Sequence, residues 1–337
     1  MGVSALTYKN PVWNGYLADP FVLRTNGVYY AFGTGSDEGA GRQFDGRVFP
    51  VLRSHDLVEW THVGGALEPL SASMSVAYWA PEVAERDGVF YLYYAADGRL
   101  RVATSRKPEG PYRDAGVDLF PKEPFTIDAS PFRDPKDGRW YLFFAKDYFD
   151  LRVGTGTAVV QLGEDMLSVV GEPQLVVRAS SDWQIYERNR TWYERVWDAW
   201  HTVEGPFALE KDGRYYCLYS GGCWQGPDYG VSFGVAEHPL GPYRDEWSHL
   251  GPAVLKGIPD QVLGPGHNSV VTGPDGTTLF MVYHAWDPGR TARRMCIDPL
   301  EWGPNGPRCL GPTTSQQHVR PSQEEGRSQS VEFPVSG

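Results

Sequence analysis

The chain of 337 residues lacks long apolar runs and any concentration of basic residues. No stretch approaches the 18 apolar residues of a membrane-spanning helix, and the first residues lack the pattern of a signal peptide. Lys and Arg number 31 against 42 Asp and Glu, which gives a formal net charge of -11. Because nucleic acids and anionic membranes bind to basic surfaces, we expect neither as a partner. The composition favours a cytoplasmic protein with a neutral substrate.

Cysteine is also scarce, with four residues in the chain. Their spacing matches neither a zinc site nor a disulfide framework, which is typical of a reducing compartment. We therefore expect four buried thiols, at Cys217, Cys223, Cys296 and Cys309.

Aromatic residues, by contrast, make up 14% of the chain, and Gly and Pro are frequent as well. Five stretches share one pattern, in which an Asn-Gly or Asp-Gly turn separates two strand-like runs, the second of them mostly aromatic. They begin at Ala18, Trp79, Asp128, Glu204 and His267. Hairpins that recur every 50 to 75 residues or so, without helical periodicity between them, predict an all-β fold, a single-domain five-bladed β-propeller.

The repeats also predict the boundaries of the domain. We expect the propeller to occupy residues 1–312, with blades at 17–67, 78–112, 127–177, 203–243 and 264–311. The polar segment 313–337 is expected either to form a loosely held tail or to add a last strand at Val331–Phe333 that closes the ring. Residues 180–200 hold four Trp and two Tyr, and we expect a loop or short helix there, folded over the pocket.

The residues that open the repeats are candidates for a shared site. Asp19, Trp79, Asp128, Glu204 and His267 begin innermost strands, which face the propeller axis, so they should converge on one pocket. Cleavage of a glycosidic bond needs one carboxylic acid to protonate the leaving oxygen and one carboxylate on the opposite face of the sugar. A third carboxylate beside the acid would raise its pKa. Three acids at equivalent repeat positions favour this chemistry over isolated turn or cap residues.

These motifs resemble glycoside hydrolase family 43, whose members are inverting five-bladed propellers acting on plant polysaccharides that contain arabinose and xylose. The match covers roughly residues 11–312. The motifs that carry it are ADPFV at 18–22, YWAPEV at 78–83, IDASPF at 127–132, EGPF at 204–207 and GPGHNSVV at 264–271, with support from SHDLVEW at 54–60 and IDPLEW at 297–302.

The resemblance implies a role for each acid. Asp19 corresponds to the general base that activates water, and Glu204 to the general acid. Asp128 corresponds to the carboxylate that raises the pKa of Glu204 and holds it in place. Arg293 matches a family arginine that binds the substrate and this modulating aspartate, although Arg294 is a close rival.

Four further residues are expected around the acids. The resemblance implies that His267 lies at the axis beside a bound ion, often calcium in this family. Calcium prefers oxygen ligands, so the alternative is a histidine hydrogen-bonded to core waters. An indole at Trp79 would stack on a sugar face or pack in the core. Trp224 and Tyr229 would line the pocket or serve packing alone.

From these residues we expect an inverting exo-hydrolase that is both a β-xylosidase and an α-L-arabinofuranosidase, acting on xylo- and arabino-oligosaccharides. Inversion predicts that the base and acid carboxyl groups lie about 6.5 to 9.5 Å apart. The first alternative is an endo-1,5-α-L-arabinanase, which needs an open groove. Others are a propeller that binds sugars without cleaving them and a retaining hydrolase of the fructan-cleaving type.

Overall fold

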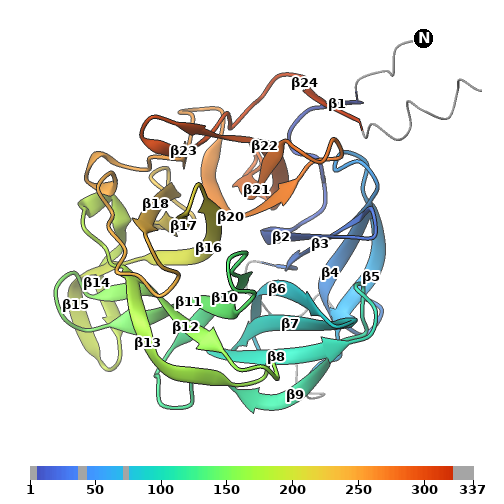
Figure 1. Ribbon diagram of the computed structural model, residues 1–337. Helices are drawn as coiled ribbons and strands as arrows, with labels where there is room; N and C mark the ends of the chain where they lie inside the picture. Colours follow the sequence, from blue (N-terminus) through green and yellow to red (C-terminus); the bar gives the residue numbers. More distant parts are fainter. Residues whose placement is uncertain (1–5, 37–43, 71–75, 322–337) are drawn as a thin grey trace, which may run out of the picture.

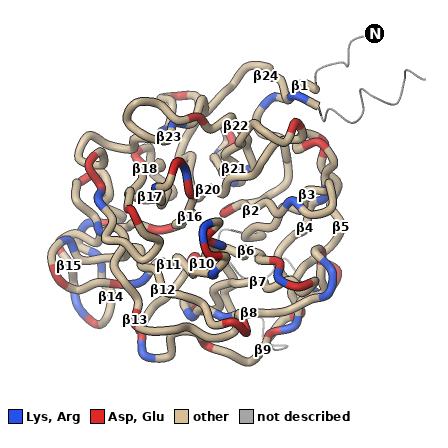
Figure 2. The backbone as a smooth tube through the Cα atoms, viewed as in Figure 1, with Lys and Arg blue, Asp and Glu red and all other residues tan. Residues whose placement is uncertain are grey.

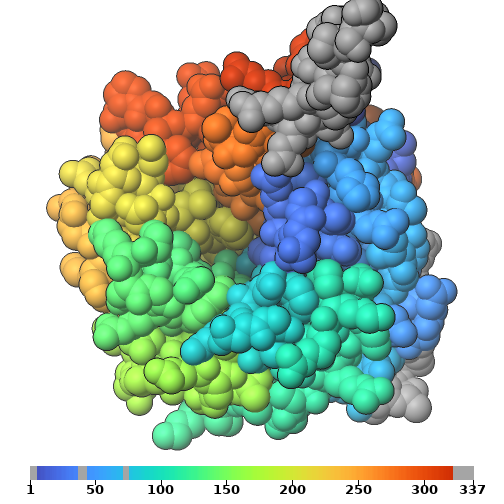
Figure 3. Space-filling view, turned by 45° about the vertical axis from the view of Figure 1, so that its right-hand side comes forward, coloured from blue at the N-terminus to red at the C-terminus, as the bar shows by residue number. Residues whose placement is uncertain are grey.

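The structure, a computed structural model, describes residues 6–36, 44–70 and 76–321 and is built almost entirely of β-strands. Five antiparallel sheets follow one another around a ring, in chain order (Figure 1). The predicted all-β, five-bladed propeller is therefore confirmed. The space-filling view shows the same succession, with the teal blade between the blue and green ones (Figure 3).

Each blade begins with its innermost strand and runs outward. Blade one contains β2 (Ala18–Thr25), β3 (Val28–Thr34), β4 (Val48–Ser54) and β5 (Thr61–Leu67). Blade two contains β6 (Tyr78–Arg86), β7 (Val89–Ala96), β8 (Arg99–Ser105) and β9 (Arg113–Asp118). Blade three contains β10 (Thr126–Arg133), β11 (Trp140–Tyr148), β12 (Gly154–Leu162) and β13 (Val169–Val177).

The last two blades follow the same plan. Blade four contains β16 (Val203–Lys211), β17 (Arg214–Gly221), β18 (Gly230–Ala236) and the short β19 (Leu255–Lys256). Blade five contains β20 (Leu263–Thr272), β21 (Leu279–Trp286), β22 (Arg293–Gly303) and β23 (Gly306–Cys309). The outermost strands of blades two and four thus lie beyond Tyr112 and Tyr243, where the sequence pattern placed the ends of these blades.

The inner hairpins owe their tight turns to residues that accept a left-handed backbone. Asn26 and Gly27 have φ values of 51° and 76°, and Asp212 and Gly213 have values of 53° and 85°. Two successive residues with positive φ form the turn whose twist matches that of the flanking strands, and Asn-Gly and Asp-Gly are the preferred pairs. The turn chemistry read from the sequence therefore fixes these hairpins.

The insertion at residues 180–200 is a hairpin, not the expected loop or short helix. A single 3-10 turn (Asp182–Gln184) leads into β14 (Ile185–Trp192) and β15 (Arg195–His201), which pair with each other. His201 of β15 also pairs in parallel with Gly154 of β12. Tyr193 and Glu194 turn the hairpin with φ values of 52° and 57°, a conformation that aromatic residues seldom adopt.

The hydrophobic core consists of five clusters, each lying between neighbouring blades. Aromatic contacts join the sheets: Phe49 of blade one packs edge-on against Tyr78 of blade two, with ring centroids 6.0 Å apart. The cluster between blades five and one, which includes Val22 and Val282, closes the ring. All four cysteines are free thiols, but Cys223 is only half-buried, so the expectation of four buried thiols was wrong at this position.

The two ends of the described chain meet outside the blades. Strand β1 (Leu6–Tyr8) pairs with β24 (Gln317–Val319) in a separate two-stranded sheet (Figure 1). Buried Asp298 accepts hydrogen bonds from Asn10 and Thr313, one residue from each terminal segment. The strand considered at Val331–Phe333 lies outside the described residues.

Residues of both charge signs are spread over the whole ring (Figure 2). In the part of the chain that the structure describes, no helix is long and apolar enough to cross a membrane.

Candidate active site

A bulge near the start of every inner strand positions the candidate residues. One residue in each bulge is left-handed, and these five are Asp19, Ala80, Asp128, Gly205 and His267, with φ values from 46° to 60°. The three acids are therefore not at equivalent positions, because Glu204 comes one residue before the left-handed position. Glycine holds that position in blade four, where a Cβ would lie 3.1 Å from Cγ of His267.

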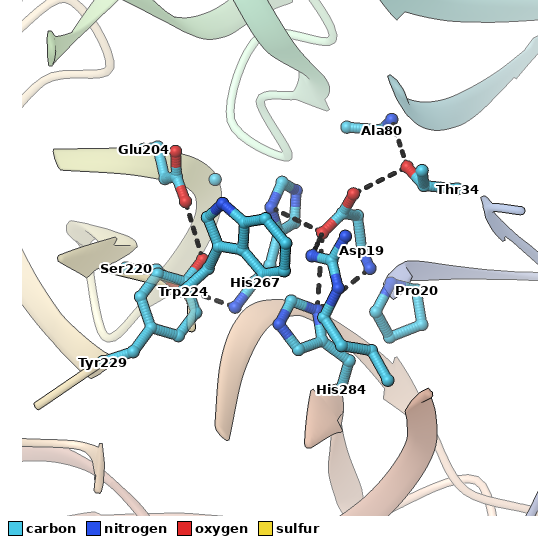
Figure 4. A network of polar contacts seen from close by, with 12 residues as sticks. Asp19, Pro20, Thr34, Ala80, Glu204, Ser220, Trp224, Tyr229, His267 and His284 are labelled. Atoms are coloured by element: carbon cyan, nitrogen blue, oxygen red, sulfur yellow. Dashed lines mark hydrogen bonds and ion pairs between the residues drawn. The ribbon is translucent and has the colours of Figure 1, made fainter. Parts of the chain in front are cut away.

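The carboxylate of Asp19 is the centre of a polar network (Figure 4). Its Oδ2 accepts a hydrogen bond of 2.6 Å from the Thr34 hydroxyl. Its Oδ1 lies 3.3 Å from both Nη1 of Arg293 and Nδ1 of His267. The residue is 9% exposed, so the base candidate faces a fixed set of protein groups.

This network keeps Asp19 ionised. Burial alone would raise the pKa of its carboxyl, but contact with His267 and Arg293 reverses the shift and lowers the pKa below its usual range. Burial lowers the pKa of His267, and that of His284 to about 4, so both imidazoles are neutral at pH 7. Arg293 therefore supplies the permanent positive charge.

The protonation of His284 follows from its backbone contact. The N–H of Asp19 donates to Nδ1 of His284 at 3.0 Å. A nitrogen that accepts this bond carries no proton, so it does not also donate to the Asp19 carboxylate 3.4 Å away. The ring proton is consequently on Nε2, and the His284–Asp19 contact is not an ion pair.

Glu204 has the opposite electrostatic character. Burial raises its pKa to about 7, and the charge of Asp19 adds to this shift, while a hydrogen bond from Tyr229 opposes it. The Tyr229 hydroxyl donates to Oε1 of Glu204 at 2.8 Å, and the ring of Tyr229 stacks on His284. Glu204 thus holds a proton over much of the pH range in which Asp19 is ionised.

Asp128 is joined to the acid through the backbone. Its Oδ2 accepts the Gly205 N–H at 2.9 Å, next to Glu204 in the chain. Burial raises the pKa of Asp128 well above its usual range, and the nearby charges of Glu204 and Asp19 raise it further. Because the two carboxyl groups repel each other when both are ionised, Asp128 and Glu204 together retain a proton near neutral pH.

The two candidate arginines lie in different surroundings. Arg293 is 5% exposed, contacts Asp19 and lies over the Trp224 ring at 4.2 Å. Its Nη1 lies 3.3 Å from Oδ1 of Asp19, the base candidate. Arg294 binds Asp287 at 2.9 Å.

The four residues expected around the acids fall into two groups. Trp224, Tyr229 and His267 join the network of Figure 4, with Trp224 half-buried beneath Arg293. Trp79 is half-buried and packs against the hydrophobic cluster between blades two and three.

The surroundings of His267 are those in which the resemblance implied a bound ion. Its Nδ1 faces Asp19, whose Oδ1 also contacts Arg293. In residues 6–36, 44–70 and 76–321, no group of three or more His, Cys, Asp or Glu could hold a metal ion. An ion at this point would take most of its ligands from water.

Sequence reasoning missed three residues that link neighbouring blades. Thr34, Ser220 and His284 each lie within the last three residues of the second strand of a blade, and each accepts the N–H of the left-handed residue in the next blade. A polar residue ending an aromatic strand, as in YYAFGT, YYCLYS and FMVYH, is a signal that could have identified them.

The β14–β15 hairpin reaches the same site. Strand β15 ends at His201, three residues before Glu204. Trp183, in the turn before β14, packs against Gly221, where a Cβ would lie 2.8 Å from the indole. Burial raises the pKa of Tyr186 on β14, and the charge of Glu204 adds to the shift.

Comparison with known proteins identifies the family of this chain. The family model described as glycosyl hydrolases family 43 matches residues 8–307. A beta-D-galactofuranosidase from Aspergillus niger is 32% identical, over 88% of this chain and 83% of its own length. The crystal structure of a thermostable family-43 glycoside hydrolase is 32% identical, with a TM-score of 0.79, and the match covers 93% of this chain and 99% of that one. A more distant relative is named as a probable arabinan endo-1,5-alpha-L-arabinosidase from Aspergillus oryzae, and it is 26% identical over 79% of this chain and 82% of its own length. Another is named as an exo-alpha-(1->5)-L-arabinofuranosidase from Cellvibrio japonicus, and it is 26% identical over 86% of this chain and 84% of its own length. The chain therefore belongs to glycosyl hydrolases family 43.

Proposed function

We propose that this glycoside hydrolase is an inverting exo-enzyme that releases terminal xylose or arabinose from xylo- and arabino-oligosaccharides. The observation that carries the proposal is the opposite shift of two pKa values in one network. The pKa of Asp19 is lowered and that of Glu204 is raised to about 7. Paired carboxyl groups whose environments separate their pKa values suit base and acid roles.

The reaction is a single displacement. Asp19 takes a proton from a water molecule as the water oxygen forms a bond to the anomeric carbon. The bond from this carbon to the leaving oxygen breaks, and Glu204 donates its proton to that oxygen. Asp19 ends protonated and Glu204 ionised, and exchange with solvent restores both.

Two neighbours support these roles. Arg293 keeps Asp19 ionised, and its stacking on Trp224 fixes the guanidinium at the site. Asp128 holds the Gly205 N–H and so orients the backbone that carries Glu204. Because Asp128 and Glu204 are close in a buried site, each disfavours ionisation of the other.

The choice of substrate follows from the names that relatives carry. Relatives named as xylosidases and arabinofuranosidases favour the dual activity. The beta-D-galactofuranosidase at 32% identity favours a second candidate, hydrolysis of galactofuranosides. An endo-arabinanase is a third, because relatives carry that name as well.

Initial rates on p-nitrophenyl β-D-xylopyranoside, α-L-arabinofuranoside and β-D-galactofuranoside would separate these candidates, with linear arabinan as a fourth substrate. Turnover of the first two is expected, with proton NMR showing the inverted anomer as the first product. Preference for the galactofuranoside would replace the pentose assignment, and cleavage of arabinan alone would favour the endo-enzyme. A retained anomer would overturn the single displacement.

Calcium near His267 remains a separate proposal, and no step above depends on it. Bound through one imidazole and water, the ion would stabilise the axis of the propeller. Thermal unfolding after chelator treatment, with and without added calcium, tests this. We expect the melting temperature to rise with calcium, and an unchanged value would remove the ion from the proposal.

A further inference from the structure

The exposed aromatic side chains of this protein gather in one place. Among the described residues, the aromatic side chains classed as exposed are Phe149, Trp192 and Tyr193, at 48%, 38% and 38%. Trp192 and Tyr193 are at the tip of the β14–β15 hairpin, and Phe149 follows β11. Their rings touch, with centroids 5.2 Å apart for Phe149 and Tyr193 and 5.5 Å for Trp192 and Tyr193. We call these three residues the aromatic platform.

The platform is held in shape from below. The Tyr193 hydroxyl donates to buried Asp147 at 2.6 Å, which ties the tip of the hairpin to blade three. Trp197 and Trp200 pack beneath Phe149, at 6.0 and 6.4 Å. The rings therefore have a fixed support and yet face solvent.

The hairpin connects this surface to the acid candidate. The Arg190 guanidinium lies over Trp192 at 5.1 Å and over Tyr186 at 4.6 Å. At the base of the hairpin, β15 ends at His201, three residues before Glu204. Trp192 follows the start of β14 by seven residues, which is about 20 Å along a strand and so several sugar rings from the base of the hairpin.

We propose that the aromatic platform binds the part of a neutral oligosaccharide or polysaccharide that extends beyond the sugar being released. Exposed apolar surface with a polar rim marks an interaction site. Sugar rings present C–H groups on their faces and hydroxyls on their edges, which suits aromatic rings with polar neighbours. The hairpin, residues 185–201, carries three Arg and three acidic residues, a balance that favours an uncharged ligand. This inference rests on the proposed glycosidase activity.

The test compares short and long substrates in the double variant Phe149→Ala/Trp192→Ala. Rates on the aryl glycosides should change less than about twofold, because these ligands end before the platform. The kcat/KM on xylohexaose or arabinohexaose should fall about tenfold, mainly through KM, as expected when about 1.4 kcal/mol of binding is lost. Trp192→Tyr keeps a ring at the tip and should restore most of the loss.

The matched control is Leu175→Ala, which removes a half-exposed apolar side chain from the outer strand of the same blade and should change neither rate. Unchanged hexasaccharide kinetics in the double variant would overturn the proposal. Binding is also measured without catalysis, by retardation of the protein in gels that contain arabinoxylan or linear arabinan. Retardation of the wild type that the double variant loses supports the platform, even if the aryl pentosides are not substrates. Absence of retardation in the wild type, or a dimer that only the wild type forms, would overturn it.

Discussion

Blades one and four open with similar sequences, Ala18-Asp19-Pro20 and Glu204-Gly205-Pro206, but place their carboxylates one residue apart. In blade one the acid occupies the left-handed position of the bulge, with φ of 51°. In blade four Gly205 takes that position, and the acid precedes it. Since neighbouring strand residues point to opposite sides, one step changes what the side chain meets.

The difference in position corresponds to a difference in exposure. Asp19, Asp128 and His267, all left-handed, are at most 9% exposed. Glu204 and Trp79, which precede the left-handed residues of their blades, are half-buried. Among these five residues, the left-handed ones are therefore held by protein contacts, and the two that precede a left-handed residue are more exposed.

The largest effects should come from removing each carboxylate. Asp19→Asn should lower kcat/KM by about 10² to 10⁴ on every substrate, because no other group activates the water. Glu204→Gln should cause a loss of that size on oligosaccharides and a much smaller one on aryl glycosides, whose leaving groups need no protonation. Steady-state rates on both substrate classes measure this contrast.

Glu210→Gln, on the same strand as Glu204 but at its far end, is the matched control and should retain full activity. Equal losses on both substrate classes for Glu204→Gln would remove this residue from the acid role.

The second contrast is in the pH profile. Glu204 donates only while protonated, so kcat/KM on oligosaccharides should fall about tenfold per pH unit above its pKa of about 7. Asp19 must be ionised, and because its pKa is lowered, the acidic limb should lie below the usual value of 3.8. Tyr229→Phe removes a bond that lowers the pKa of Glu204, so the alkaline limb should move to higher pH. If the alkaline limb of Tyr229→Phe does not move, the group that titrates there is not one whose pKa Tyr229 affects.

The third contrast concerns the hydroxyl that supports the base. Thr34→Val keeps the shape but removes both the donor to Asp19 and the acceptor of the Ala80 N–H. Unpaired buried groups cost about 1 to 3 kcal/mol, so the free energy of unfolding should fall by about this amount, together with activity. Thr34→Ser, measured by urea denaturation, should behave like the wild type. If Thr34→Val and Thr34→Ser had the same free energy of unfolding, the hydroxyl would not support the base.

The smallest effect is expected on stability, from substitutions at the left-handed positions of two bulges. Gly205→Ala forces a Cβ into a conformation that costs about 1 to 2 kcal/mol and places it against His267. Ala80→Gly, at the same position of blade two, should leave stability within about 1 kcal/mol of the wild type. The melting temperatures of the two variants test whether blade four depends on glycine at this position. An unchanged melting temperature in Gly205→Ala would show that it does not.

Much of the fold was predictable because the information is local. Turn pairs such as Asn26-Gly27 determine the hairpins, and their recurrence determines the number of blades. The hairpin at 185–201 was not predictable in this way, because neither Tyr193 nor Glu194, which form its turn, is a residue type that favours turns. The short strand Leu255–Lys256 was missed because two residues carry no periodicity.

The candidate site was predictable as a set of residues but not as a geometry. The repeats pointed to Asp19, Asp128 and Glu204, yet the one-residue offset of Glu204 depends on which residue of each bulge is left-handed. His284 was missed because its role depends on the packing of blade five against blade one, and a polar residue near the end of a strand does not show which group of the next blade it contacts.

The link from His284 to Asp19 has a consequence for how the protein folds. During synthesis Asp19 emerges early, and the imidazole that binds its backbone N–H follows 265 residues later. Contacts so distant along the chain form slowly, because the loop between them must first be ordered. The base therefore reaches its final position only when the last blade has docked on the first. We expect activity to recover later than blade structure during refolding, so the return of hydrolytic activity should measure closure of the ring.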